Sequence, residues 1–319
     1  MRKGTGQLLG KALKRLGQPV TRRYILPGEA NEAVAEAKQR TASLPRGTRA
    51  LYRKDGKVLL AGQRDRLLIQ AVRDRVDLSG IHLVRTNLRD RNLDMAKMDG
   101  ADLRLSDLSS TRMNSAHLTD ADLRRVRLSK FYARGLEAAK SDFSEARLFK
   151  AVFEGSNLTA SSFAGARVIR SNLSTCQLAG ADFSGAVLKG SNLRDSCLIS
   201  AGFDGSTVKG GNFSSADLRE IDFSTCSFGK HRYYDDFGHY TVDRINLCGA
   251  DLRGSIFRAD ANFSSMNLRN AKLDDIVLLD SYGEPITGAC LQNDGTIVYS
   301  EVMDVPKLAR ENPRIPGIS

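Results

Sequence analysis

The segment from Gly229 to Thr241 has the highest density of side chains that could bind a ligand or a partner. It contains three Tyr, one Phe, two His, two Asp, one Lys and one Arg. Its imidazole and carboxylate groups offer one set of metal ligands, namely His231, Asp235, Asp236 and His239. We predict no metal site there, because bulky tyrosines separate these residues and nothing nearby fixes their geometry.

The same segment supplies aromatic side chains that suit protein recognition. Tyrosine is enriched at the energetic centres of protein interfaces, and loops on a rigid scaffold often carry recognition. We therefore favour a protein-contact loop anchored by Tyr233, Tyr234 and Tyr240. The alternative is a loop that folds back over its own neighbouring segment and covers a bare edge.

The sequence contains no catalytic motif that we could find. It has no Gly-rich phosphate loop, no G-x-S-x-G element, no zinc-ligand spacing and no pair of carboxylates in an evident pocket. We therefore expect a protein that is not an enzyme and that has no cofactor and no metal centre.

A five-residue rhythm organises most of the chain. From Leu78 to Phe228, 31 positions recur at intervals of five, and 29 of them are Leu, Met, Phe or Val. This spacing matches neither a helix nor an ordinary strand, so it predicts a solenoid. Small residues such as Ala101 and Ala121 stand two positions before the large apolar ones. Each repeat can therefore point two side chains into a narrow core.

The repeated unit reads Ala-Asp-Leu-x-x, as in Ala101-Asp102-Leu103, Ala121-Asp122-Leu123 and Ala250-Asp251-Leu252. Over residues 76–280 it resembles the pentapeptide-repeat family. The resemblance implies an all-β solenoid, a right-handed quadrilateral β-helix with one repeat on each side and about 20 residues per coil.

Residues 20 apart would then lie above one another. The core should contain one column of stacked rings, formed by Phe143, Phe163, Phe183, Phe203 and Phe223. A second column carries Asp102, Asp122, Asp142, Asp182 and Asp222. We expect these carboxylates to accept hydrogen bonds from backbone amides at the turns, and we prefer that interpretation to a row of cation ligands.

The rhythm is interrupted twice. It is lost over residues 229–241, resumes with Val242, Leu247 and Leu252, and shifts by one residue between Phe257 and Phe263. The first break predicts an inserted loop and the second a bulge. Residues 281–319 leave the repeat, and we expect them to form a C-terminal cap, with a turn and a strand at 297–299, followed by an extended tail.

Residues 1–75 form a basic head of different composition. They hold 18 Lys or Arg against 6 Asp or Glu, a net charge of +12, whereas the other residues hold 30 against 31. We expect a mainly helical head, with amphipathic helices at 6–16 and 29–38, a hairpin at 51–61 and a helix at 64–75 that covers the end of the solenoid. Its candidate partner-binding residues are Lys11, Lys14, Arg15, Arg22 and Arg23.

The favoured function is that of a non-catalytic interaction or structural protein, a rigid rod docked into a larger assembly through its basic head. The head suits an anionic surface, either an acidic protein or a nucleic acid, with lipid binding or targeting as a further alternative. The candidate partner-binding residues of the rod itself are Arg124, Arg125 and Arg127. The rods could also form a homodimer through their coil ends.

Two other functions stay open. Well-studied members of the resembling family protect type II topoisomerases such as gyrase by imitating DNA with an acidic rod. The net charge of −1 outside the head does not favour this role. The other function is a translocated effector, exported by a route other than Sec, for which the unusual amino terminus is the hint.

The five cysteines are odd in number and have no metal-ligand spacing, which indicates an intracellular reducing compartment such as the cytoplasm. An alternative is that the protein is incorporated into a larger particle. No segment is apolar over the roughly 18 residues that a membrane-spanning helix needs, so we expect no transmembrane segment.

Overall fold

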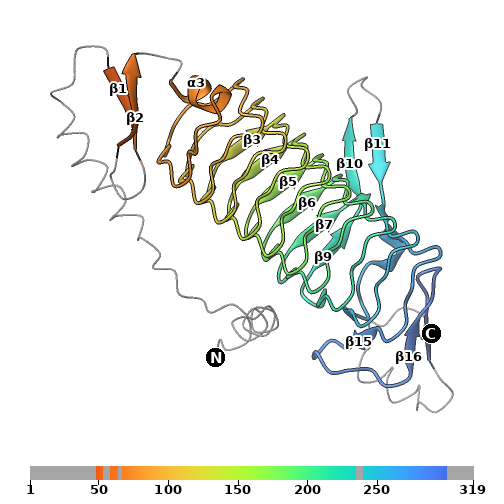
Figure 1. Cartoon of the computed structure of the whole chain (residues 1–319). Helices are drawn as coiled ribbons and strands as arrows, with labels where there is room; N and C mark the ends of the chain where they lie inside the picture. The colour runs from red at the N-terminus through yellow and green to blue at the C-terminus, as the bar shows by residue number, and fades with distance from the viewer. Residues whose placement is uncertain (1–47, 53–57, 64–66, 235–239, 300–319) are drawn as a thin grey trace, which may run out of the picture.

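The computed structural model describes residues 48–52, 58–63, 67–234 and 240–299. Most of them form an elongated rod in which the chain winds through stacked coils (Figure 1). Bridges between parallel segments join residues 20 apart, as in the series Asp102, Asp122 and Asp142. Four such bridge columns run along the rod, one on each side of the coil. The predicted all-β, four-sided solenoid is therefore confirmed.

One side of the coil forms a continuous parallel sheet of six strands. The pairing residues are in register at each step, so that Arg127 pairs with Arg147 and Arg147 with Arg167. The strands are β3 (Arg127–Ser129), β4 (Arg147–Phe149), β5 (Arg167–Ile169), β6 (Val187–Lys189), β7 (Thr207–Lys209) and β9 (Ser227–Gly229). Further along the rod, parallel pairing joins β8 (Gly211–Asn212), β12 (Ile245–Asn246) and β14 (Met266–Asn267), and also β13 (Ile256–Arg258) and β15 (Val277–Leu279).

Large apolar side chains fill the interior of the coils. The rings of Phe143, Phe163, Phe183, Phe203 and Phe223 form a single column, with successive centroids 5.0, 5.1, 5.1 and 5.2 Å apart. The first three contacts are stacked and the last is tilted by 48°. Phe257 continues the column at 5.0 Å from Phe223.

Small polar residues of the inner column satisfy their hydrogen bonds within the core. Ser106 Oγ donates to the carbonyl of Leu83 at 2.5 Å, and Ser156 Oγ donates to the carbonyl of Ala133 at 2.8 Å. The thiol of Cys176 donates in the same way to the carbonyl of Phe153 at 3.0 Å. A Ser or Cys can therefore replace Ala in the core without leaving a buried polar atom unpaired.

The described part of the head consists of a hairpin and one short helix. Strands β1 (Thr48–Tyr52) and β2 (Val58–Gln63) pair antiparallel, as predicted. Helix α3 (Leu67–Arg73) follows, and its Ala71, Ile69 and Val72 pack against the core cluster at the first coil. This helix covers the end of the rod, as expected. The helices predicted at 6–16 and 29–38 lie outside the described residues.

The inserted segment is a β-hairpin. Strands β10 (His231–Tyr234) and β11 (Tyr240–Asp243) pair antiparallel and project from the rod (Figure 1). Val242 belongs to this hairpin, opposite Arg232, so our prediction that the repeat resumes at Val242 is wrong. The parallel ladder resumes where Asn246 pairs with Asn212, 34 positions earlier instead of 20, so the insertion adds 14 residues.

The far end of the rod is covered by a third hairpin. The one-residue shift is present, because Asn267 pairs with Asn246, 21 positions earlier. A short 3-10 helix, η2 (Phe263–Ser265), lies at this shift. Strands β16 (Ala289–Leu291) and β17 (Ile297–Tyr299) then pair antiparallel, with Leu291 buried against the core.

Candidate functional site

The interior of the rod has no room for a ligand. One internal gap of about 10 Å³ lies among the coils, and its lining is entirely apolar, with Phe203, Phe213 and Leu252 among the contributors. A volume of this size holds at most about one water molecule, which would find no polar partner there. Candidate functional surfaces must therefore be sought on the outer sides of the rod and on the hairpin that projects from it.

On one side of the rod the aspartates accept backbone hydrogen bonds, as the sequence predicts. The amide of the residue two positions later donates to each carboxylate at 2.8–3.4 Å, for Asp102, Asp122, Asp142, Asp182 and Asp222. Ser162 holds the same position in the column, and its hydroxyl accepts from the amide of Ala164 at 3.3 Å. These contacts fix the turns between neighbouring sides.

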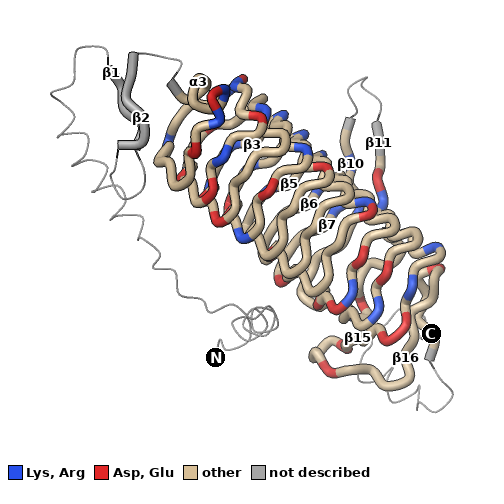
Figure 2. The backbone as a smooth tube through the Cα atoms, in the orientation of Figure 1, with Lys and Arg blue, Asp and Glu red and all other residues tan. Residues whose placement is uncertain are grey.

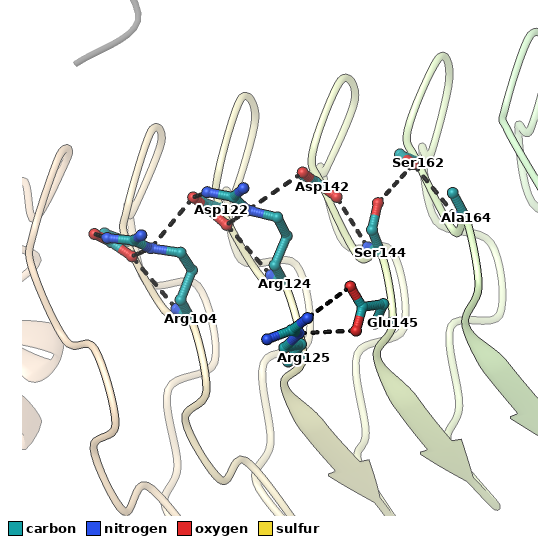
Figure 3. Close-up of polar contacts among 10 residues, drawn as sticks. Arg104, Asp122, Arg124, Arg125, Asp142, Ser144, Glu145, Ser162 and Ala164 are labelled. Carbon is teal, nitrogen blue, oxygen red and sulfur yellow. Dashed lines mark hydrogen bonds and ion pairs between the residues drawn. The ribbon is translucent and has the colours of Figure 1, made fainter. Parts of the chain in front are cut away.

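Arginines on this side connect the aspartates of successive coils (Figure 3). Arg104 binds Asp102 through Nη2–Oδ2 at 2.7 Å and Nε–Oδ1 at 2.8 Å, and its Nε also lies 3.4 Å from Asp122 Oδ2. Arg124 repeats this arrangement with Asp122 at 2.7 and 2.9 Å and with Asp142 at 3.5 Å. We call this alternating series, from Asp102 to Asp142, the Asp–Arg ladder.

The Asp–Arg ladder is partly buried, and this alters its protonation. Burial alone would raise the pKa of Asp102, but hydrogen bonds from Arg104 and His82 outweigh it and hold that pKa well below its usual range. His82 Nδ1 lies 3.2 Å from Asp102 Oδ2. The hydrogen bond to Asp102 is the main cause that raises the pKa of Arg104. The pair of Asp102 and Arg104 therefore remains charged at neutral pH.

The same Asp-Leu-Arg motif forms bidentate pairs on a second side of the rod. Arg219 binds Asp217 at 2.7 and 2.8 Å, and Arg253 binds Asp251 at 2.7 and 2.9 Å. The hydrogen bond from Arg253 is the largest cause that lowers the pKa of Asp251. An Arg two positions after an Asp therefore turns back to its own carboxylate at all four Asp-Leu-Arg sites.

These contacts separate the three rod arginines that the sequence nominates for partner binding. Arg124 belongs to the Asp–Arg ladder, and Arg125 pairs with Glu145 through Nε–Oε2 at 2.8 Å and Nη2–Oε1 at 3.1 Å (Figure 3). Arg127 instead lies on β3 with an exposed side chain. The head residues Lys11, Lys14, Arg15, Arg22 and Arg23 lie outside the described residues.

Arg127 belongs to a set of basic residues that the sequence analysis did not recognise. The six strands of the large sheet and the residue after each strand occupy 127–130, 147–150, 167–170, 187–190, 207–210 and 227–230. These segments contain no Asp or Glu and nine Lys or Arg, which are Arg127, Lys130, Arg147, Lys150, Arg167, Arg170, Lys189, Lys209 and Lys230. We call this surface the cationic sheet face. Elsewhere along the rod both signs of charge occur (Figure 2).

The base of the hairpin is fixed against the rod. A Cβ atom at Gly210 would lie 2.7 Å from the Cβ of His231 and 2.8 Å from that of Asp243, so the close approach requires glycine. The ring of Tyr233 lies 4.8 Å from that of His231 and 4.8 Å from the Arg170 guanidinium carbon. Tyr233 therefore packs on the rod at the base of the hairpin. The side chains of Tyr234 and Tyr240 lie outside the description, as do Asp235, Asp236 and His239.

Within the described residues, no three His, Cys, Asp or Glu side chains form a group that could hold a metal ion. No described helix is both long and apolar enough to cross a bilayer. The cysteines are free thiols, and burial raises the pKa of Cys176 to about 12 and that of Cys226 to about 11. Neither buried thiol is a nucleophile at neutral pH.

Comparison with known proteins agrees with this architecture. Residues 74–109, 92–129, 141–176 and 171–210 match the family model described as pentapeptide repeats, in eight copies. No curated protein matches the chain. Residues 74–129 and 141–210 of the β-solenoid are therefore pentapeptide repeats.

Several solved structures are similar to the chain. A pentapeptide repeat protein from the Arabidopsis thaliana thylakoid lumen has 34% identity over 27% of this chain and 61% of its own, with a TM-score of 0.27. HetL, involved in heterocyst differentiation regulation in Nostoc sp. strain PCC 7120, has 20% identity over 70% of this chain and 100% of its own, with a TM-score of 0.24. QnrB1, a plasmid-mediated fluoroquinolone resistance protein, has 18% identity over 66% of this chain and 88% of its own, with a TM-score of 0.30.

Proposed function

We propose that this chain is a non-catalytic interaction protein, a rigid rod that docks into a larger assembly through its basic head. One observation carries the proposal. Large apolar side chains fill the core, and the gap between Phe203, Phe213 and Leu252 is only about 10 Å³, so the outer surfaces are the candidates for function. Rungs that pair in register over six strands make those surfaces stiff and regular, as a spacer or docking platform requires.

The distribution of charge supports the head as the docking element. Residues 1–75 carry a net charge of +12, while the remaining residues carry 30 Lys or Arg against 31 Asp or Glu. An anionic partner would therefore be attracted to one end of the molecule. The free cysteines fit a reducing intracellular compartment, which we propose as the location.

Topoisomerase protection through imitation of DNA is a weaker candidate. An imitation of DNA must present dense negative charge along its length. The large sheet presents nine Lys or Arg and no Asp or Glu instead. The described residues offer no observation in favour of a translocated effector, so that role stays a prediction from the amino terminus alone.

Truncation of the head tests the docking proposal. Because α3 covers the first coil, the deletion should stop at residue 46 and so keep β1, β2 and α3 in place. It removes ten Lys or Arg and three Asp or Glu. We expect a folded rod that no longer recovers the partner captured by the full chain at low salt. Replacement of Lys11, Lys14, Arg15, Arg22 and Arg23 by Gln in the full chain should reproduce the loss. Unchanged recovery by both variants would refute docking through the head.

A further inference from the structure

We propose that a hollow on strands β4 and β5 binds a phosphotyrosine side chain of a protein partner, with Arg147 and Arg167 on the phosphate and Phe149 stacked on the ring. We call it the Arg147–Arg167 hollow, and its lining residues are Ser129, Arg147, Leu148, Phe149, Arg167 and Ile169. The inference rests on the proposed function and deepens it, because it names what one outer surface of a non-catalytic interaction protein recognises. It concerns the rod, whereas docking was assigned to the head.

The first argument is the placement of two arginines beside two apolar side chains. On β4, Arg147 and Phe149 are exposed on either side of the buried Leu148. On β5, Arg167 and Ile169 take the same places, in register with their counterparts on β4. Neighbouring rungs lie about 4.8 Å apart, and two residues separated by one position on a strand lie about 7 Å apart on the same face. Both cations and both apolar groups are therefore within the reach of one small ligand.

The second argument is that both arginines are available. Neither Arg147 nor Arg167 forms an ion pair with another described residue. Glu145, the acidic residue nearest to Arg147 along the chain, is bound by Arg125 through both carboxylate oxygens. The segment 155–181 around Arg167 contains no Asp or Glu. Like charges in adjacent rungs repel each other, and a bound dianion would remove that repulsion.

The site is limited to these two arginines because their basic neighbours are engaged. Asp107 pairs with Arg127 across adjacent rungs of the ladder. Lys150 and Arg170 have partners of their own, and the Arg170 guanidinium lies 4.8 Å from the centroid of the Tyr233 ring. A long polyanion would therefore meet no continuous row of available cations, whereas a single phosphate group needs only two.

The third argument is the exposed aromatic ring beside the arginines. Phe149 is 41% accessible, although its side chain is large and apolar. It borders the Arg147–Arg167 hollow, whose volume of about 500 Å³ lies in the range of sites that take small ligands. Aromatic rings gain from offset contact with other rings. Phe149 therefore offers a stacking surface next to the two cations.

These features favour a phosphate carried on an aromatic ring over other anions. A phosphate monoester has about two negative charges and three acceptor oxygens, so it matches two guanidinium groups that each donate as a fork. A carboxylate would neutralise only one of them. Phosphotyrosine holds its phosphate next to its ring, as Arg147 and Phe149 lie next to each other on β4. Phosphoserine has no ring, and a nucleotide places a ribose between its ring and its phosphate.

The test measures the binding of three probes to the full chain by isothermal titration calorimetry at about pH 7.5, where a phosphate monoester is largely a dianion. The probes are N-acetyl phosphotyrosine amide, N-acetyl phosphoserine amide and AMP. One double variant replaces Arg147 and Arg167 by Gln. Its control replaces Arg85 and Arg269 by Gln, two exposed arginines elsewhere on the rod, with the same loss of charge.

We expect the phosphotyrosine probe to bind the unmodified chain about fivefold more tightly than the phosphoserine probe, because only its ring stacks on Phe149. The Arg147 and Arg167 double variant should bind both of these probes about tenfold more weakly, and the control should stay within about twofold of the unmodified chain. Lys at the two positions should weaken binding about threefold, because an ammonium group lacks the fork. Phe149→Leu should weaken the phosphotyrosine probe about fivefold and leave the phosphoserine probe unchanged. Thermal melts would verify that every variant is folded.

Equal losses in the double variant and its control would overturn the proposal, since they would show a response to net charge only. Binding of the phosphoserine probe or of AMP as tightly as the phosphotyrosine probe would overturn it too, because the ring next to the phosphate would then have no role. No detectable binding of the phosphotyrosine probe by the unmodified chain would do the same. Deletion of residues 1–46 should leave probe binding unchanged, so the failure of this inference and the failure of docking through the head are distinguishable.

Discussion

Two neighbouring sides of the rod carry columns of arginine, and they use them in opposite ways. On the Asp–Arg ladder, Arg104 lies 2.7 Å from Asp102 and 3.4 Å from Asp122, so its charge is neutralised within the protein. On the cationic sheet face, Arg147 and Arg167 lie in adjacent rungs, and the six segments of that face contain no Asp or Glu. The role of an arginine in this fold therefore depends on which residues lie two positions before it and 18 to 20 positions after it.

This difference separates stability from recognition. A partly buried ion pair constrains its neighbours, and the loss of one partner leaves the other charge without compensation. An exposed arginine without a carboxylate contributes little to folding and stays available for an external ligand. The Asp–Arg ladder should therefore respond to mutation through the free energy of unfolding, and the cationic sheet face through binding.

Asp102→Asn should have the largest effect on stability. Asn keeps the turn acceptor but removes the charge that compensates Arg104, whose side chain is only 12% exposed. We expect the free energy of unfolding to fall by about 2–3 kcal/mol, measured by urea denaturation. The matched control is Asp222→Asn, an exposed residue in the same column that is followed by Ser224 instead of Arg. The control should lose less than about 0.5 kcal/mol of its free energy of unfolding. Equal losses in the two variants would show that the Asp–Arg ladder does not stabilise the fold.

Acid should weaken the ladder over a defined range of pH. The pKa of Asp102 is lowered in the folded protein, so this carboxylate contributes its full stabilisation above its unfolded pKa of about 4. As the pH falls below that value, the unfolded chain takes up the proton first and the contribution declines. We would measure the free energy of unfolding of the unmodified protein and of Asp102→Asn from pH 6 to pH 3. The difference between the two values should shrink as the pH falls. A constant difference between them would contradict this account.

The smallest effect is expected for Arg147→Gln on the cationic sheet face. Removal of one charge relieves repulsion from Arg127 and Arg167, so stability should stay within about 0.5 kcal/mol or rise slightly. Added salt screens the same repulsion. The melting temperature of the unmodified protein should therefore rise more with salt than that of the variant. A loss as large as that of Asp102→Asn would remove the distinction between the two sides.

Much of the fold was predictable because the five-residue rhythm is a direct consequence of packing. Each repeat must point the same two positions inward, so Leu103 and Ala101 already specify which side chains are buried. The 20-residue coil places Asp102 and Asp142 in one column at the turns. Their position at a turn predicts that each carboxylate accepts a backbone hydrogen bond. The capping helix at the first coil was predictable as well, because an open solenoid end needs an apolar cover.

The surface was less predictable, because it depends on where long flexible side chains turn. The sequence grouped Arg124, Arg125 and Arg127 by their proximity along the chain, yet they lie in three different environments. The basic residues at 127, 147 and 167 also form a column at the 20-residue coil length, as the Phe and Asp residues do. Val242 lies five residues before Leu247, and this spacing wrongly placed it in the repeat. A single apolar residue fits a hairpin strand equally well, and Val242 lies in such a strand.

The sequence by itself determined the rod, its core and the positive charge of the head, since periodic burial and composition do not depend on side-chain direction. Only the tertiary structure decided which arginines are neutralised and which are available. That decision rests on contacts within one coil and between successive coils, as for Arg124, which lies 2.7 Å from Asp122 in its own coil and 3.5 Å from Asp142 in the next. Such contacts depend on three-dimensional stacking, which brings residues 18 to 20 positions apart within the reach of one guanidinium group.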